Sequence, residues 1–132
     1  MIKNNFAYTI LYVQDVKQSL EFYKTAFGLE TKFITPDNTY GELITEGTTL
    51  SFASVGLART NLKDGFIESN SADKPFGMEI GLTTHNVQEA VDRAIIAGAL
   101  LVEKPKTKPW GQTVAYVKDI DGFLVEICTP IL

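Results

Sequence analysis

The sequence is poor in the residues that build disulfides and metal centres. It holds one cysteine, Cys128, and one histidine, His85. A single cysteine excludes an internal disulfide and fits a reducing compartment. One histidine cannot supply an iron site of the type that uses two imidazoles and a carboxylate. No apolar run approaches the roughly 20 residues of a membrane span, and the N-terminus lacks an apolar leader segment, so we expect a cytoplasmic protein with no membrane partner.

Positive charge is also scarce. The net charge is −4, which argues against nucleic acid as a partner, because such proteins normally present a basic face. Three lysines at 104, 106 and 108 lie beside Glu103 in a proline-punctuated segment, which we predict to be a solvated loop. Phosphate-binding glycine loops, nucleophile elbows and CxxC pairs are absent from the sequence.

The first half contains a strand followed by an amphipathic helix. The apolar, β-branched segment 8–16 includes Asp15, which forms a capping pair with Gln18 three residues later. Gly28 ends the predicted helix, because glycine adopts the left-handed conformation without steric cost. The apolar positions of this helix fall on one face; they are Val16, Leu20, Tyr23 and Phe27.

The second half repeats this pattern. A strand is predicted over 78–84, and Asn86 with Glu89 forms the second capping pair. Gly98 ends the second helix. The apolar stripe of that helix consists of Val87, Ala90, Val91, Ala94 and Ile95.

Three strand-like runs follow each helix, and the last two runs of each half are joined by a tight glycine turn. The runs are predicted at 30–35, 40–45 and 48–54, and again at 99–103, 112–117 and 123–129. The order βαβββ, twice, differs from the ferredoxin-like order βαββαβ. We therefore predict an α+β protein, one compact domain with modules at 1–54 and 77–132. Residues 55–76 are predicted to be a linker with one short element at most, and a candidate lid.

These motifs resemble the vicinal-oxygen-chelate superfamily, which includes glyoxalases, bleomycin-resistance proteins and dioxygenases. The opening signature is carried by Asp15-Val16, Ser19-Leu20, Phe22-Tyr23 and Phe27-Gly28-Leu29, and the closing signature by Pro109-Trp110-Gly111-Gln112 and residues 119–127. The resemblance implies curved mixed sheets around a cleft that holds a small molecule, often completed in a homodimer. The superfamily spans lyases, isomerases, dioxygenases, thiol transferases and metal-free drug-sequestering proteins, so the fold alone does not decide the function.

The resemblance also implies site positions on the first and last strand of each module. These positions hold Tyr8, Ser51, Glu79 and Glu126 in this sequence, and only Glu126 matches the family pattern. Strand alternation places Glu79 and Glu126 on the cavity face. Because the set lacks imidazole, we expect no metal and no other cofactor, although two carboxylates could still hold Mg²⁺ or Mn²⁺ with water.

Two carboxylates on one partly buried face would repel each other and titrate as a coupled pair. A cationic ligand could neutralise them, or one could act as an acid and the other as a base. Alternatively, they pair with lysine, arginine or backbone donors. Aromatic side chains that could line the cleft, rather than the core, are Tyr8, Tyr12, Tyr40, Phe52, Trp110 and Tyr116.

The favoured hypothesis is a metal-free small-molecule-binding protein that sequesters an antibiotic-like or cationic aromatic ligand. The alternative is an atypical glyoxalase-like lyase or isomerase that uses Glu126, with Glu79, as metal ligand or acid–base group. Whether the cleft closes within one chain or across a homodimer stays open. The predicted ligand-binding residues are Tyr8, Tyr12, Tyr40, Ser51, Phe52, Glu79, Trp110, Tyr116 and Glu126, and Glu126 is the catalytic candidate.

Overall fold

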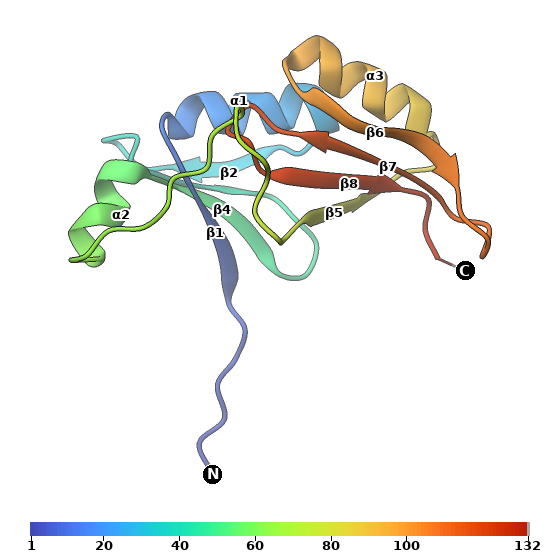
Figure 1. Cartoon of the computed structure of the whole chain (residues 1–132). Helices are drawn as coiled ribbons and strands as arrows, with labels where there is room; N and C mark the ends of the chain where they lie inside the picture. Colours follow the sequence, from blue (N-terminus) through green and yellow to red (C-terminus); the bar gives the residue numbers. More distant parts are fainter. Residues whose placement is uncertain (132) are drawn as a thin grey trace. The chain divides into compact units, whose positions relative to one another are not determined.

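The computed structural model describes residues 1–131 and divides into two units (Figure 1). The first unit comprises Met1–Lys24 and Gly28–Glu68, and the second comprises Thr25–Phe27 and the chain from Ser69 onward. The first unit contains β1 (Tyr8–Val13), α1 (Val16–Phe27), β2 (Thr31–Ile34), β3 (Tyr40–Leu43), β4 (Thr49–Ser54) and α2 (Val55–Asn61). The second contains β5 (Ile80–Thr83), α3 (Val87–Ala97), β6 (Leu100–Thr107), β7 (Thr113–Lys118) and β8 (Leu124–Cys128).

Each unit holds one four-stranded mixed sheet of the same topology. The strand orders are β1-β4-β3-β2 and β5-β8-β7-β6. In both sheets the first strand pairs in parallel with the last, and the other pairs are antiparallel. Ile10 lies opposite Ser51 in the first sheet, and Gly81 lies opposite Glu126 in the second. The predicted α+β fold with duplicated βαβββ modules is thereby confirmed.

The caps of both long helices form as their sequences indicate. The Asp15 carboxylate accepts a 3.0 Å hydrogen bond from the backbone N–H of Gln18, and the Asn86 side chain accepts one of 3.1 Å from Glu89. These bonds satisfy backbone donors that a helix start leaves unpaired. Gly28 closes α1 at a φ of 71°, a conformation in which other residues pay a steric cost.

One side of each sheet is covered by a helix and forms the core. In the first unit, Phe52 of β4 is fully buried and its ring lies 5.1 Å from that of Tyr23 in α1. A Cβ added to Gly41 of β3 would lie 2.7 Å from Leu20 of the same helix, so this glycine permits close packing. In the second unit, the core side carries Val125 and Ile127, which are 0% and 1% exposed.

The opposite side of each sheet is called the open face below. Strand alternation and cross-strand pairing assign its residues. In the first unit they include Tyr8, Ile10, Tyr12, Tyr40, Glu42 and Ser51. In the second unit they include Gly81, Val114, Tyr116, Glu126 and Cys128.

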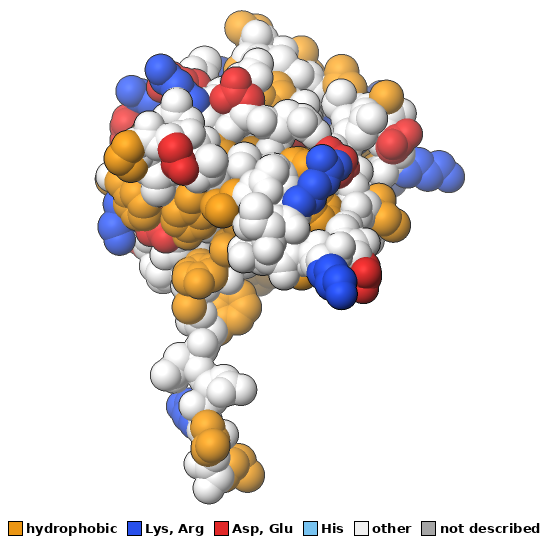
Figure 2. Space-filling model, turned by 90° about the vertical axis from the view of Figure 1, so that its left-hand side faces the viewer, with side chains coloured by type: hydrophobic (Ala, Val, Ile, Leu, Met, Phe, Trp, Pro, Cys, Tyr) orange, Lys and Arg blue, Asp and Glu red, His pale blue; other side chains and the backbone are white. Residues whose placement is uncertain are grey.

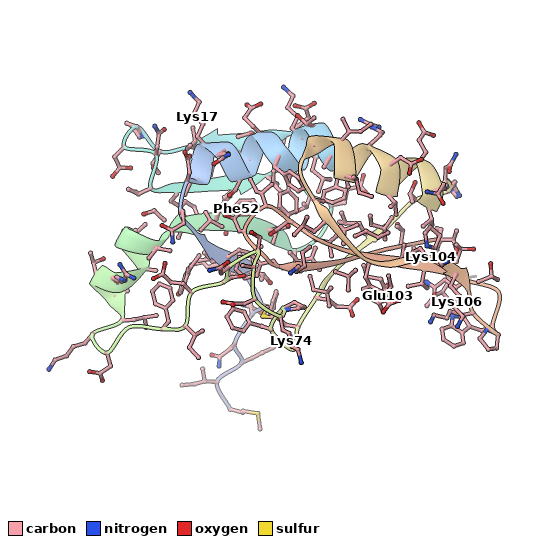
Figure 3. All side chains as sticks on the ribbon, turned by 45° about the horizontal axis from the view of Figure 1, so that its top comes forward. Lys17, Phe52, Lys74, Glu103, Lys104 and Lys106 are labelled. Carbon is pink, nitrogen blue, oxygen red and sulfur yellow. The ribbon has the colours of Figure 1, made fainter. Side chains whose placement is uncertain are left out.

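Two segments differ from the sequence-based expectations. The lysine-rich segment is largely a strand, because β6 extends through Pro105 to Thr107, and Glu103, Lys104 and Lys106 lie on it (Figure 3). Proline is tolerated there because β6 is an edge strand, whose outward N–H groups need no partner. The predicted linker begins with helix α2, which Ser54 caps by accepting a 3.0 Å bond from Leu57.

The surface carries no single dominant charge in the view of Figure 2, where Lys and Arg side chains alternate with Asp and Glu. The first seven residues extend away from β1 without regular structure, and Met1, Ile2 and Phe6 are exposed (Figures 1 and 2). None of the helices in residues 1–131 has the length and apolar character that crossing a membrane would require.

Candidate functional site

Two glutamates meet on the open face of the second unit. Glu126 lies on the inner strand β8, opposite Gly81 of β5 and Tyr116 of β7. Glu79 precedes β5 by one residue, and its side chain forms a hydrogen bond with that of Glu126. The sequence-based expectation that the two carboxylates share one face therefore agrees with their placement.

Burial raises the pKa of Glu79 above its ordinary value of 4.5, and both the charge of Glu126 and the hydrogen bond to it raise this pKa further. Two carboxyl groups in contact cannot both ionise without repulsion, so one proton is retained between them. Glu79 is the group on which this proton is held.

Two neutral side chains contact Glu126 as well. The hydroxyl of Tyr116 donates a 3.0 Å hydrogen bond to Oε1 of Glu126. Burial, with the hydrogen bond to Glu126 next, raises the pKa of Tyr116 to about 12 and that of Cys128 to about 11. Both groups therefore keep their protons near neutral pH and add no charge. The Cys128 thiol, 4% exposed, also lies 3.7 Å from the carbonyl oxygen of Leu82.

No lysine or arginine forms an ion pair with Glu79 or Glu126 in the described part of the chain. Lys118, which shares the open face, instead donates from Nζ to the carbonyl oxygens of Ser71 (2.7 Å) and Asp73 (3.1 Å). The alternative that basic side chains satisfy the two glutamates is therefore not what the structure contains. The pair carries negative charge without a cationic partner.

Trp110 is connected to this face through Gln112. The indole is 66% exposed, and its Nε1 donates to Oε1 of Gln112 at 2.9 Å. Gln112 in turn donates to the carbonyl oxygen of Thr129 (2.8 Å) and forms a hydrogen bond with the Cys128 side chain. Sequence reasoning missed Gln112, although its position two residues after the tryptophan, where the loop enters β7, was a usable signal.

The open face of the first unit has different chemistry. Tyr40 donates a 2.6 Å hydrogen bond to Oε2 of Glu42, and Nζ of Lys32 lies 4.0 Å from the other carboxylate oxygen. Glu42, which the sequence-based list omitted, is thus the carboxylate of this face, and it has a cation nearby. Ser51 is buried and donates to the carbonyl oxygen of Thr9 at 3.2 Å.

The other predicted residues of the first unit fall into two groups. Tyr8 is 53% exposed, and the ring of Tyr12 packs 4.8 Å from that of Phe66, so both lie on the open face. Phe52 does not, because its fully buried ring points toward α1 (Figure 3). Phe52 is a core residue, and its place among the expected lining residues is corrected.

The donor set does not fit a dedicated metal centre. Residues 1–131 contain no group of three or more His, Cys, Asp or Glu side chains that could hold a metal ion. His85 is exposed and lies outside the sheet, directly before the α3 cap. A carboxyl pair accompanied by a protonated phenol and thiol offers too few ligands for zinc or iron. The chemistry proposed below therefore passes through no metal.

Comparisons with known proteins agree with this fold. The family model described as a glyoxalase-like domain matches residues 6–132. A search of functionally curated proteins found no match.

Solved structures of similar fold include a glyoxalase-related enzyme from Fulvimarina pelagi, with 22% identity, a TM-score of 0.81, and coverage of 97% of this chain and 89% of that chain. The hypothetical protein SA1046 from S. aureus is 23% identical, with a TM-score of 0.78 and coverage of 98% and 95%. A glyoxalase/bleomycin resistance protein/dioxygenase family enzyme from Burkholderia phytofirmans PsJN is 18% identical, with a TM-score of 0.80 and coverage of 98% and 100%. With both signatures and the duplicated sheets in place, the chain belongs to the glyoxalase-like domain family of the glyoxalase/bleomycin-resistance/dioxygenase superfamily.

Proposed function

We propose that this chain is a metal-free small-molecule-binding protein that sequesters an antibiotic-like or cationic aromatic ligand on the open face of the second unit. The observation that carries the proposal is the Glu79–Glu126 pair, which has no cationic partner among the described residues. A ligand that brings positive charge and N–H donors would relieve the repulsion between these carboxylates.

Aromatic side chains beside the pair support a flat ligand. Tyr116 contacts Glu126 directly, and Trp110 is tied to the same face through Gln112. Aromatic rings attract cations placed over their faces and stack on flat apolar bodies. A ligand that is both aromatic and cationic would therefore use both kinds of contact.

Four residues of the first unit belong to the same proposal as further ligand contacts. Tyr8, Tyr12, Tyr40 and Ser51 lie on the open face of that unit. Tyr8 is the most accessible of them, whereas Ser51 is buried and already donates to a backbone carbonyl. We expect Tyr8 to contribute more to binding than Ser51, and substitution of each would rank them.

The experiment that tests the proposal is a titration with a panel of flat cationic compounds and their neutral isosteres, followed by fluorescence. Trp110 is the only tryptophan, so a change in emission reports on its surroundings. We expect cationic members to bind, and Glu79→Gln or Glu126→Gln to weaken that binding about tenfold or more, because a hydrogen bond to a charged group is lost.

The matched control is Glu21→Gln, the same chemical change at an exposed position of α1 away from both open faces. This variant should bind like the unmodified protein. Silence across the panel, checked by a second method such as calorimetry, would contradict the proposal. Equal loss of binding in the control would show that net charge, rather than the carboxyl pair, controls affinity.

A second candidate function, acid–base catalysis, is favoured by the raised pKa of Glu79 beside Glu126. A protonated carboxyl next to a carboxylate can give a proton to one substrate atom while its neighbour takes one from another, as an isomerase or lyase requires. Proton exchange into carbonyl compounds in D₂O, followed by NMR, would detect this activity. Retained exchange in a folded Glu126→Gln variant would exclude Glu126 as the base.

A cytoplasmic homodimer completes the proposal. The single, buried Cys128 is compatible with a reducing compartment. Light scattering of the purified protein at several concentrations tests the oligomeric state. A mass of one chain at all concentrations would contradict the dimer and leave the binding proposal standing.

A further inference from the structure

The hydrogen bonds around Glu126 define what the open face of the second unit can accept. Tyr116 donates its hydroxyl proton to Oε1 of Glu126, and the side chains of Glu79 and Cys128 also form hydrogen bonds with this carboxylate. All three are neutral donors when protonated. Glu126 is therefore solvated by the protein without being neutralised by it.

Only one of these three protons can be exchanged near neutral pH. The phenol of Tyr116 and the thiol of Cys128 hold theirs up to pKa values of about 12 and about 11. The carboxyl of Glu79 has a raised pKa, but it remains a carboxyl group on the open face. A group that displaces a proton from this cluster must therefore displace the one on Glu79.

The surrounding charges favour a cation in that place. On β6, Glu103 lies opposite Tyr116 and adds a further acidic group, while Lys106 lies one row away, opposite Val114. On β7, the ammonium group of Lys118 is held by two backbone carbonyls. On β8, Cys128 is neutral, and no basic residue of β5 or β8 shares this face.

We propose that the ligand of this site carries one cationic N–H group, an ammonium, amidinium or guanidinium, which binds between Glu79 and Glu126 in exchange for the proton that they share. The inference rests on the proposed binding function and names the chemistry of its ligand. The balance is simple: the cation enters, Glu79 becomes a carboxylate, and one proton leaves to the solvent. The cation and the proton each contribute one positive charge, so the charge of the site is conserved.

This exchange also explains why the site needs both carboxyl groups. A forked amidinium or guanidinium presents parallel N–H donors, which match carboxylate oxygens better than a single proton does. A neutral amide of the same shape offers N–H donors but no charge, so it cannot compensate for the second ionised carboxyl. Discrimination between these two groups is the signature of the proposed chemistry.

The test compares benzamidine, a flat aromatic amidinium, with benzamide, its neutral isostere, by isothermal calorimetry. Measurements run from about pH 5 to about pH 8 in two buffers of different ionisation enthalpy, which together give the number of protons released. We expect release of up to one proton per benzamidine bound. Affinity should rise about tenfold per pH unit until Glu79 is ionised in the free protein, and then level off. Benzamide should bind weakly and without proton release.

Three variants sharpen the readout. Glu79→Gln should bind benzamidine at least about tenfold more weakly and remove proton release, because a hydrogen bond to a charged group is lost and no exchangeable proton remains. Glu79→Asp keeps the carboxyl and should retain proton release, which covers the case in which the amide variant folds poorly. Glu21→Gln should match the unmodified protein in both quantities.

The outcomes separate this inference from the function on which it rests. If neutral or anionic compounds of a broad panel bind as well as benzamidine, or if benzamidine binds without releasing protons, the inference is wrong and the binding function stands. If neither benzamidine nor any panel member binds, both fail. A ¹³C titration in which the Glu79 carboxyl ionises at its ordinary pKa and does not respond to benzamidine would also overturn the inference.

Discussion

Tyr116 and Glu126 are cross-strand neighbours, and the hydroxyl of the first donates a 3.0 Å hydrogen bond to the carboxylate of the second. At the corresponding place in the first unit, Glu42 lies opposite Ser51. The duplicated scaffold thus holds an acid on the middle strand of one sheet and on the last strand of the other. Only the acid on the last strand meets a second carboxyl group, and this difference assigns the binding proposal to the second unit.

Replacing Tyr116 with phenylalanine should remove the last tyrosine to ionise in alkaline titration. Burial and the contact with Glu126 raise the pKa of this phenol from 10.0 to about 12, so the folded state holds its proton more tightly than the unfolded chain. Stability should therefore fall as pH rises from about 10 toward 12 in the unmodified protein, and less so in Tyr116→Phe. Absorbance of tyrosinate measures the ionisation, and a titration that keeps its step near pH 12 in the variant would reassign it to another tyrosine. Near neutral pH the variant should lose about 1 kcal/mol, the usual value of such a hydrogen bond.

Replacing Glu79 with glutamine should change how stability depends on pH. The folded state raises the pKa of Glu79 above 4.5, so it binds a proton that the unfolded chain has already released. Stability from this group is therefore fully present below about pH 4.5 and is lost as pH rises through the raised value. The variant should be relatively more stable than the unmodified protein at neutral pH than at pH 4. Denaturant unfolding at both pH values provides the measurement, and a difference of opposite sign would contradict the burial of this carboxyl.

Cys128 should react slowly with thiol reagents in the folded protein. Its side chain is buried, and its pKa is raised to about 11, so little thiolate exists at mildly alkaline pH. Ellman's reagent should label it fully in denaturant but over 100-fold more slowly under native conditions, because only about one free thiol in a thousand is ionised at pH 8 and the sulfur is covered. Rapid native labelling would show that this part of the open face is more accessible than described.

Two glycines in equivalent turns should respond differently to alanine. Gly122, between β7 and β8, has a φ of 92°, and an added Cβ would lie 2.4 Å from the carbonyl oxygen of Asn70. Gly47, between β3 and β4, has a φ of 83° and open space around it. Gly47→Ala should cost about 1–2 kcal/mol from the left-handed backbone alone. Gly122→Ala should cost at least about 1 kcal/mol more, because backbone must move as well. Thermal or denaturant unfolding of both variants measures the difference, and equal losses would contradict the close contact at Gly122.

Helices and strand order were predictable because their signals are local. The spacing of Val16, Leu20 and Tyr23 identified the buried side of α1, and the capping residues marked where both long helices begin. Strand alternation also placed Glu126 on the face opposite Val125 and Ile127. Phe52 shows where alternation was not applied strictly: it follows Ser51 directly, so the two side chains had to face opposite sides of β4.

Side-chain partners were harder to predict than faces. The pairing of β2 with β3 and of β6 with β7 includes register shifts, between Thr31 and Phe33 in the first sheet and on either side of Glu103 in the second. A shift of this kind changes which residues lie opposite one another, and periodicity does not reveal it. The Glu42–Tyr40 and Gln112–Trp110 contacts depend on side-chain reach over two residues within strand or loop, so no sequence spacing singled them out.

The parallel pairing of the first and last strand in each sheet has a consequence for synthesis. β5 has no partner in its sheet except β8, which ends at Cys128, close to the C-terminus. The first sheet, by contrast, has all its strands once the chain has reached Ser54. On the ribosome, β5 must therefore wait unpaired until almost the last residues emerge, while β1 acquires its neighbour early. The two halves of a duplicated fold thus mature at different times, and the half with the carboxyl pair is the later one.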